Sequence, residues 1–401
     1  MARTHDGRPT EATTTTVQKQ TMIALDDPAA SPALGSFWGP GGFVWWYLEI
    51  GDGAGNAVVC IWSFGLPFLP GIAGAARDGA GPAAATRPSM HVAGYLAGRE
   101  EMYVLHELPP EQVEALADGW RFGGTTIHSR LVGDALELHL QLDLPVHNGP
   151  RLVGEVRVLG QRARWQEGHR EALDASAHRW TPLCGAAFGT ARLRCGDTRL
   201  LVTGRAYHDR NHAPRSLEAL GIGLWVWGRV AHADHDRVFY ALEPADGGDS
   251  TTLAVTVDGD GTLRLEPDAA ATCGDRRRTR WGMREARHWA VTTRGGAFLA
   301  VDTTAAIEDG PFYLRRLVRS ATGEHGTLEA ITPARIDRPW QRPLIRMRVS
   351  DARRRGSIWL PLFEGPRRHR VARLLGLWRD DGDATTDGDR HSDAGAIHEG
   401  P

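Results

Sequence analysis

The chain has 401 residues, and its 47 Lys+Arg nearly balance its 49 Asp+Glu, so the formal net charge is −2. This length favours two domains, each large enough to bury a hydrophobic core. The balanced charge excludes the excess of basic residues that a phosphate-binding surface needs, so we expect no nucleic-acid partner.

Residue usage excludes several kinds of chemistry. Lys19 is the single lysine, which excludes Schiff-base and P-loop chemistry from the core of the chain. The four cysteines are too far apart for a CxxC pair, and scattered thiols favour a reducing compartment. The polar first 30 residues lack the apolar stretch of a signal peptide, so we expect a cytoplasmic protein.

Hydrophobic periodicity predicts strands far more often than helices. Residues 136–144 alternate strictly, with five leucines on one face and polar groups on the other, which is typical of a half-buried antiparallel strand. Many short strands with turns between them predict an all-β fold with two antiparallel barrel or sandwich domains and few short helices. Similar runs, mostly bounded by Gly, Pro, Asp or Asn, occupy residues 43–50, 57–64, 152–159, 187–194, 224–230, 237–242, 251–257, 297–302 and 344–349.

The charged segment 161–179 divides the chain, and we place the domain boundary there, giving domains at 31–170 and 171–379. Residues 1–30 and 380–401 are polar and are expected to be disordered tails. A short helix is expected at 109–116 and an amphipathic one at 367–378. We favour docking of the second helix across a barrel, but together with the uncharged stretch 61–76 it is also a candidate for peripheral membrane contact.

The densest cluster of reactive side chains follows the apolar run 200–203. Six positions hold Tyr, two His, Asp, Arg and Asn, and such groups are costly to bury without a purpose. If this segment is extended, its side chains form two sets on opposite faces, and one set alone can point into a barrel. The sets are Tyr207, Asp209 and Asn211 on one face, and His208, Arg210 and His212 on the other.

Tryptophans accompany this cluster. Trp225 and Trp227 share one face of the next predicted strand, and Trp46 and Trp62 lie in the first domain. Aromatic faces can line an apolar pocket and stabilise a carbocation, although a single tryptophan is more often a core residue.

These segments resemble the carotenoid 1,2-hydratase (hydroxyneurosporene synthase) family. The string YHDRN followed by WVWGR is similar to the family pattern GYHDHNWG followed by WxWGR. FVWWYLEI and VVCIWSFGLPFLP near the start, and PFYLR and ITPARIDRPW near the end, extend the resemblance over residues 37–349. The superfamily is also similar to fungal decalin-forming Diels–Alderases, and it implies two lipocalin-like β-barrels with a hydrophobic site near their junction.

The resemblance implies a hydratase acting on a carotenoid or another polyene. His208, Asp209 and Asn211 match the motif, whereas Arg210 replaces its second His and His212 replaces its Trp. Where related hydratases show a Tyr-x-Asp strand, this chain has Tyr240-Ala241-Leu242.

Hydration of an alkene needs an acid, an aromatic surface for the cation, and a positioned water. Asp209 is the predicted acid, with its pKa raised by burial, and His208 or His212 is predicted to activate the water. Tyr240, with Trp225 and Trp227, is predicted to stabilise the cation. Tyr207, Asn211, Trp46 and Trp62 complete the predicted substrate-binding set.

Three other interpretations stay open at this point. A cyclase would fold a polyene by shape and need no strong acid. A carrier would enclose a hydrophobic ligand without reaction, and the polar cluster could also be a buried scaffold network. We predict no metal, because the His and Asp residues at 232–236 are typical of a solvated turn, and no nucleotide cofactor, because no GxGxxG lies between a strand and a helix.

Overall fold

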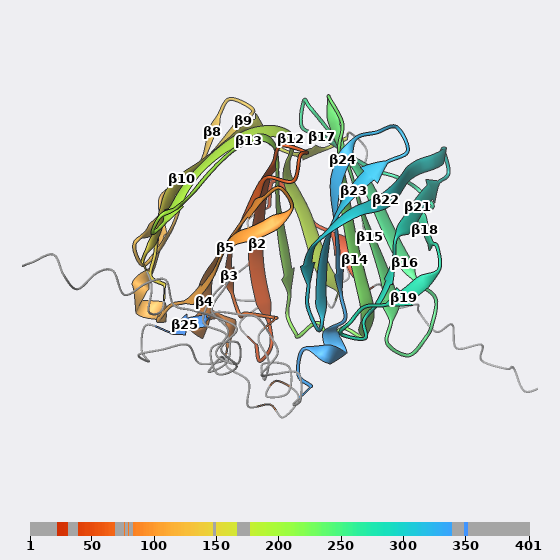
Figure 1. Ribbon diagram of the computed structural model, residues 1–401, viewed down its shortest axis with the longest axis horizontal. Helices are drawn as coiled ribbons and strands as arrows, with labels where there is room; N and C mark the ends of the chain where they lie inside the picture. Colours follow the sequence, from red (N-terminus) through yellow and green to blue (C-terminus); the bar gives the residue numbers. More distant parts are fainter. Residues whose placement is uncertain are drawn as a thin grey trace, which may run out of the picture.

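The computed structural model describes residues 22–30, 39–68, 76, 79, 83–146, 150–166, 177–338 and 349–351. These residues form two curled, mostly antiparallel sheets that lie side by side (Figure 1). The all-β prediction is confirmed. Among the described residues, the named helical elements are three short 3-10 turns: η2 (Ala84–Thr86), η3 (Pro110–Gln112) and η4 (Pro333–Arg335).

The larger sheet combines N-terminal strands with a long hairpin from the middle of the chain. A short strand, β1 (Ile23–Leu25), pairs with it in parallel. In spatial order its other described strands are β25 (Val349–Asp351), β5 (Arg99–Glu107), β4 (Pro88–Leu96), β3 (Ala57–Phe64), β2 (Phe43–Gly51), β13 (Thr198–Ala213), β12 (His178–Cys195), β10 (Leu152–Gln161), β9 (Ala135–Leu144), β8 (Thr125–Val132), β7 (Gly119–Phe122) and β6 (Val113–Leu116).

The smaller sheet is built mainly from residues after 220. A separate hairpin, β19 (Arg276–Arg278) and β20 (Arg284–Ala286), accompanies it. In spatial order its described strands are β11 (Arg164–Trp165), β17 (Thr262–Leu265), β16 (Thr251–Asp258), β15 (His235–Pro244), β14 (Ile222–Ala231), β24 (His325–Ile331), β23 (Tyr313–Ser320), β22 (Gly296–Asp309), β21 (His288–Thr293) and β18 (Ala270–Cys273).

Alternation along the strands fills three hydrophobic cores. In β9 the five leucines are buried while the residues between them are exposed or half-buried, as the sequence predicts. They lie inside the curl of the larger sheet, where Trp46 of β2 stacks on Trp62 of β3 and contacts Trp120 of β7. A second core lies inside the curl of the smaller sheet, and a third lies where the two sheets pack face to face.

The predicted helix at 109–116 is wrong. Pro110–Gln112 form a single 3-10 turn, and Val113–Leu116 continue as strand β6, paired with β7. The β-branched Val113 favours a strand here. Pairing with the edge of β7 also gives the backbone of β6 the hydrogen bonds that a helix would otherwise supply.

The predicted domain limits do not coincide with the sheets. Strands β12 and β13 follow residue 170 but pair with β10 and β2, so both belong to the larger sheet. Part of the expected N-terminal tail is ordered, because Met22, Ile23 and Leu25 are apolar and buried. Residues 1–21, most of 69–82, the expected helix 367–378 and the expected tail 380–401 lie outside the described residues. In the part that is described, no helix has the length and apolar character of a membrane span.

A substitution in β9 tests the alternation. Leu140 is fully buried, so Leu140→Ala should lower the free energy of unfolding by about 2–5 kcal/mol through lost burial and a residual cavity. The exposed Glu137 on the same strand is the control, and Glu137→Ala should change it by no more than about 0.5 kcal/mol. Urea denaturation measures both; equal effects would contradict the assigned faces.

Candidate active site

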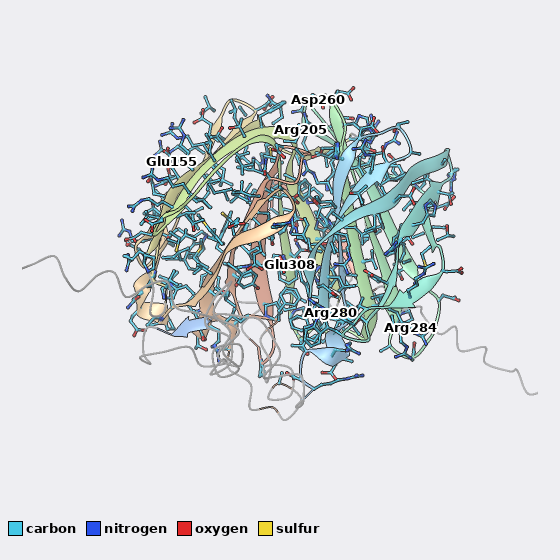
Figure 2. The ribbon with its side chains drawn as sticks, viewed as in Figure 1. Glu155, Arg205, Asp260, Arg280, Arg284 and Glu308 are labelled. Atoms are coloured by element: carbon cyan, nitrogen blue, oxygen red, sulfur yellow. The ribbon has the colours of Figure 1, made fainter. Side chains whose placement is uncertain are left out.

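A cavity of about 650 Å³ lies between the two sheets. Strands β2, β3, β4, β5 and β13 of the larger sheet contribute to one wall, and β14, β15, β22, β23 and β24 of the smaller sheet to the other. Figure 2 shows Glu308, one of the lining residues, between the sheets. The exposed Arg280 also lines the cavity, so this end of it reaches solvent.

Strand register explains why chemistry-bearing side chains gather there. Paired residues of neighbouring strands point to the same face, so a row of register partners projects into the cavity together. On the larger sheet one row consists of Asp209, Tyr47, Ile61 and His91. On the smaller sheet the facing row consists of Tyr240, Trp227, Glu329, Arg315 and Glu308.

Asp209 lies on the cavity wall and is almost completely buried. Its Oδ2 accepts hydrogen bonds from Trp180 Nε1 at 2.8 Å and from the Tyr207 hydroxyl at 3.1 Å. Its Oδ1 accepts one from Asn211 Nδ2 at 2.9 Å. All three donors are uncharged, so they orient the carboxyl without supplying the positive charge that would compensate its ionised form.

Burial therefore dominates the protonation of Asp209. It raises the pKa of the carboxyl to about 7, although the bonds from Trp180 and Tyr207 lower it. A carboxyl with this pKa holds a proton for much of the time near neutral pH, which an ordinary aspartic acid does not.

Asn211 connects Asp209 to Tyr240. Its Oδ1 accepts hydrogen bonds from the Tyr240 hydroxyl at 3.0 Å and from His178 Nε2 at 2.9 Å. Burial lowers the pKa of His178 to about 3, so this imidazole is neutral and donates through Nε2. The network fixes the Tyr240 ring on the wall beside Asp209.

Tryptophans and tyrosines surround the acid. Trp225 stacks on Trp45 with ring centroids 5.8 Å apart and lies 5.3 Å from Tyr240. Trp227 lies 5.5 Å from Tyr47, and its buried indole nitrogen has no hydrogen-bond partner among the described residues. The walls near Asp209 thus present π faces and one free N–H donor.

Four of the predicted site residues lie on the other face of β2, β3 and β13, away from the cavity. His208 stacks on Trp62 at 5.3 Å, and its Nδ1 lies 2.8 Å from the Tyr47 carbonyl oxygen. Trp46 belongs to the same core. His212 Nε2 contacts Asp26 Oδ2 at 3.0 Å. Alternation along β13 leaves this choice of face open. The structure places Tyr207, Asp209 and Asn211 on the face toward the smaller sheet, where Asp209 and Asn211 line the cavity and Tyr207 is buried behind them without lining it.

The structure adds a charged cluster that sequence reasoning missed. Arg315 Nη1 donates to Glu329 Oε1 at 2.5 Å, and Arg315 Nη2 lies 3.2 Å from Glu49 Oε2. Tyr47 donates to Glu49 at 2.7 Å, and Tyr95 bonds Glu308. The sequence does contain a hint of this cluster, because its charged residues lie within or next to apolar runs, at positions that face inward on a strand. Their partners come from distant strands, so local patterns do not reveal the pairing.

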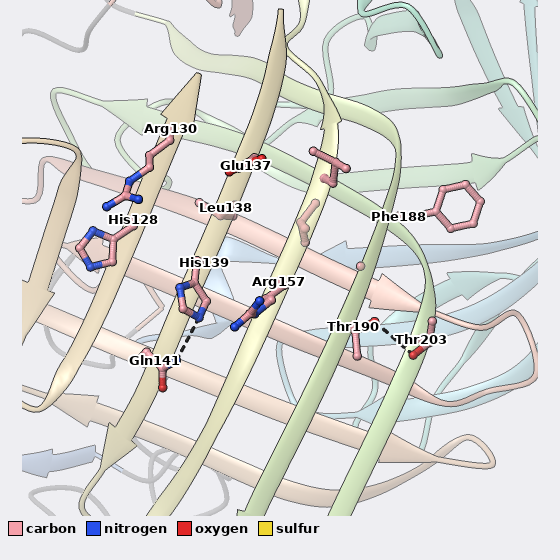
Figure 3. Close-up of a pocket in the computed structure, with 13 residues that line it drawn as sticks. His128, Arg130, Glu137, Leu138, His139, Gln141, Arg157, Phe188, Thr190 and Thr203 are labelled. Atoms are coloured by element: carbon pink, nitrogen blue, oxygen red, sulfur yellow. Dashed lines mark hydrogen bonds between the residues drawn. The ribbon is translucent and has the colours of Figure 1, made fainter. Parts of the chain in front are cut away.

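A second hollow, of about 620 Å³, lies on the outer face of the larger sheet (Figure 3). Thr203 lines this hollow and lies on β13 an even number of residues from Asp209, so the two side chains point to the same face of the strand. The smaller sheet covers this face around Asp209. His139 and Arg157 both bond Glu155 there. Its lining residues include none of the predicted site residues.

The fold and the cavity define a two-sheet β protein with a buried acid in an aromatic pocket. The crystal structure of an AttH protein from Nitrosomonas europaea is similar, with a TM-score of 0.53 and 13% identity over 73% of this chain and 93% of that chain. This likeness supports the lipocalin-like fold. Within the described ranges, no three His, Cys, Asp or Glu side chains are arranged to hold a metal ion.

The family model for carotenoid hydratase CrtC matches residues 87–359. The chain belongs to this family, and it is an enzyme of the hydratase type. An acyclic carotenoid 1,2-hydratase of Thiocapsa roseopersicina is 27% identical over 75% of this chain and 70% of its own length. One from Rubrivivax gelatinosus is 26% identical over 76% of this chain and 74% of its own length.

The raised pKa of Asp209 predicts a pH-dependent stability. Above about pH 4 the unfolded state releases the proton of Asp209, whereas the folded state keeps it up to about pH 7. The contribution of this group to the free energy of unfolding is therefore complete below about pH 4 and is lost as the pH rises through about 7. At about 1.4 kcal/mol per pKa unit, the wild type should lose on the order of 3 kcal/mol more than Asp209→Asn between pH 4 and 7. Urea unfolding across this range measures the difference; parallel curves would contradict the assignment.

Proposed function

We propose that this protein adds water to a carbon–carbon double bond of an acyclic carotenoid or a similar polyene, with Asp209 as the acid. The observation that carries the proposal is the environment of Asp209: a buried carboxyl on a cavity wall, bonded by uncharged donors. Family membership and the names of the two relatives support hydration and the substrate class.

The reaction begins when Asp209 gives its proton to the terminal double bond. The alkene π electrons form the new C–H bond, which leaves a tertiary carbocation and an ionised Asp209. The faces of Trp225, Trp227 and Tyr240 stabilise the cation through their quadrupoles. Water then forms the C–O bond and releases a proton, which restores neutrality.

The strand that carries Tyr240 departs from the family motif, and the loss of an acid there is what a cyclase would also show. Leu242 stands where the family pattern has the Asp of Tyr-x-Asp, and it is buried in the apolar core between the sheets. That position carries no acid in this chain. Asp209 is the cavity carboxyl that is connected to Tyr240 by hydrogen bonds, because Asn211 donates to Asp209 and accepts from the Tyr240 hydroxyl.

Asp209→Asn should lower kcat for hydration of lycopene in detergent micelles by about 10²–10⁴-fold, since general acid catalysis contributes on this scale. Asp197→Asn, at the exposed tip of the same β12–β13 hairpin, is the matched control and should keep full turnover. Chromatography with mass detection follows the product.

The same assay separates the competing functions. Product heavier by one water supports hydration, whereas unchanged mass with an altered chromophore would support a cyclase. A ligand that is retained but unaltered would support a carrier. Full hydration by Asp209→Asn would remove Asp209 from the role of acid.

The aromatic wall gives a second test. A desolvated cation–π contact contributes about 2 kcal/mol, so Trp227→Leu should lower kcat by about 30-fold. Trp227→Phe keeps a π face and should recover part of this loss. Equal kcat for the Leu and Phe variants would show that Trp227 acts by volume alone.

A further inference from the structure

We propose that Glu329, held by Arg315 on the wall opposite Asp209, is the base that takes a proton from the water as it adds to the substrate cation. This inference rests on the proposed hydration. It divides the acid and the base between the two sheets.

Glu329 occupies the required place by strand register. It lies on β24 between Trp227 of β14 and Arg315 of β23, in the row that faces the cavity, and it lines the cavity. Trp227 is one of the aromatic residues that would stabilise the cation. With the cation held at this ring, a base beside the ring would reach the water that attacks the cation.

Tyr47 lies next to Asp209 in its row and reaches Glu329 on the other sheet. It is the register partner of Asp209 on the larger sheet, and its hydroxyl lies 3.4 Å from Glu329 Oε1 on the smaller sheet. The Tyr47 side chain therefore spans the gap between the walls. Asp209 and Glu329 both line the same cavity.

The hydrogen-bond donors to the two carboxyls differ in charge. Asp209 has uncharged donors, which leave its ionised form uncompensated, so it is the group that keeps a proton. Glu329 accepts a hydrogen bond from the guanidinium of Arg315, which favours the ionised form of the glutamate. We therefore assign the role of acid to the carboxyl with neutral donors and the role of base to the carboxyl with a cationic one.

The neighbours of Glu329 keep it from being a permanently ionised carboxylate. Burial raises its pKa to about 7, Arg315 lowers it, and Glu49 and Glu308 raise it. A carboxylate with a pKa near the working pH is an effective base. The titratable and charged groups facing it are Arg315 and Tyr313 of β23, Tyr47 and Glu49 of β2, Glu308 of β22, Asp209 of β13 and Tyr240 of β15.

The step balances in atoms and charge. A water oxygen lone pair forms the C–O bond to the cation, and the O–H electrons return to oxygen as Glu329 takes the proton. The product is a neutral tertiary alcohol, and Glu329 is now protonated while Asp209 is ionised. Proton exchange with solvent through the open end of the cavity restores both groups.

Glu329→Gln keeps the size of the side chain and removes its basicity, so hydration of lycopene should fall by about 10²–10⁴-fold. In D₂O the variant should still place deuterium on the alkene carbon, because protonation by Asp209 and its reversal need no base for water. The ratio of deuterium exchange to hydration should therefore rise at least about tenfold over wild type. Equal loss of exchange and hydration would overturn the proposal, since that is the effect of a structural defect.

The control breaks a similar ion pair on the opposite face of the same strand. Arg316 follows Arg315 on β23 and bonds Glu285 at 2.7 Å, outside the cavity lining. Glu285→Gln should leave both rates unchanged. Glu329→Asp keeps a carboxylate and should recover part of the hydration that Glu329→Gln loses, and no recovery in a variant that unfolds at the wild-type temperature would contradict the role of base.

The pH profile separates this inference from the proposed function. Wild-type kcat should fall on the acid side as Glu329 becomes protonated and on the alkaline side as Asp209 ionises. Glu329→Gln should lose the acid limb and keep the alkaline one. If Asp209→Asn retains full turnover, the proposed function fails; if Asp209→Asn is inactive while Glu329→Gln keeps wild-type turnover and both limbs, this inference alone fails.

Discussion

The cost of burying carboxyl groups between two packed sheets is the constraint on which the rest of this structure depends. A carboxylate in this gap must be paired with a positive charge or be neutralised by taking up a proton. Glu49 and Glu329 share Arg315, whereas Asp209 has hydrogen-bond donors without charge. The same packing that excludes water from the tryptophans therefore sets the protonation of both candidate catalytic groups.

The fold makes this arrangement with ordinary strand geometry. Register places Asp209 and Tyr47 in one row and Trp227, Glu329 and Arg315 in the facing row. The larger sheet keeps its own core on its concave side, so that its outer face is available to the smaller sheet. One face of β13 thus contributes to the site while the other, with His208, stabilises the barrel interior.

Local patterns in the sequence predict much of this. The alternation of leucines in β9 predicts a strand with one buried face, and the cluster at 207–212 identifies Asp209 and Asn211. The choice between the two faces of β13, the pairing of β12 and β13 with the larger sheet, and the contact of Arg315 with Glu49 depend on residues far apart in the chain. Periodicity carries no information on such pairings, so the sequence alone does not separate His208 and Trp62 from the residues that line the cavity.

The protonation state of Asp209 is the central claim, and difference infrared spectroscopy tests it most directly. The spectrum of wild type minus Asp209→Asn should contain the C=O band of a protonated carboxylic acid at pH 6, and this band should be replaced by carboxylate bands at pH 9. Carboxylate bands at both pH values would show that Asp209 is ionised in the folded protein and would contradict its role as the acid.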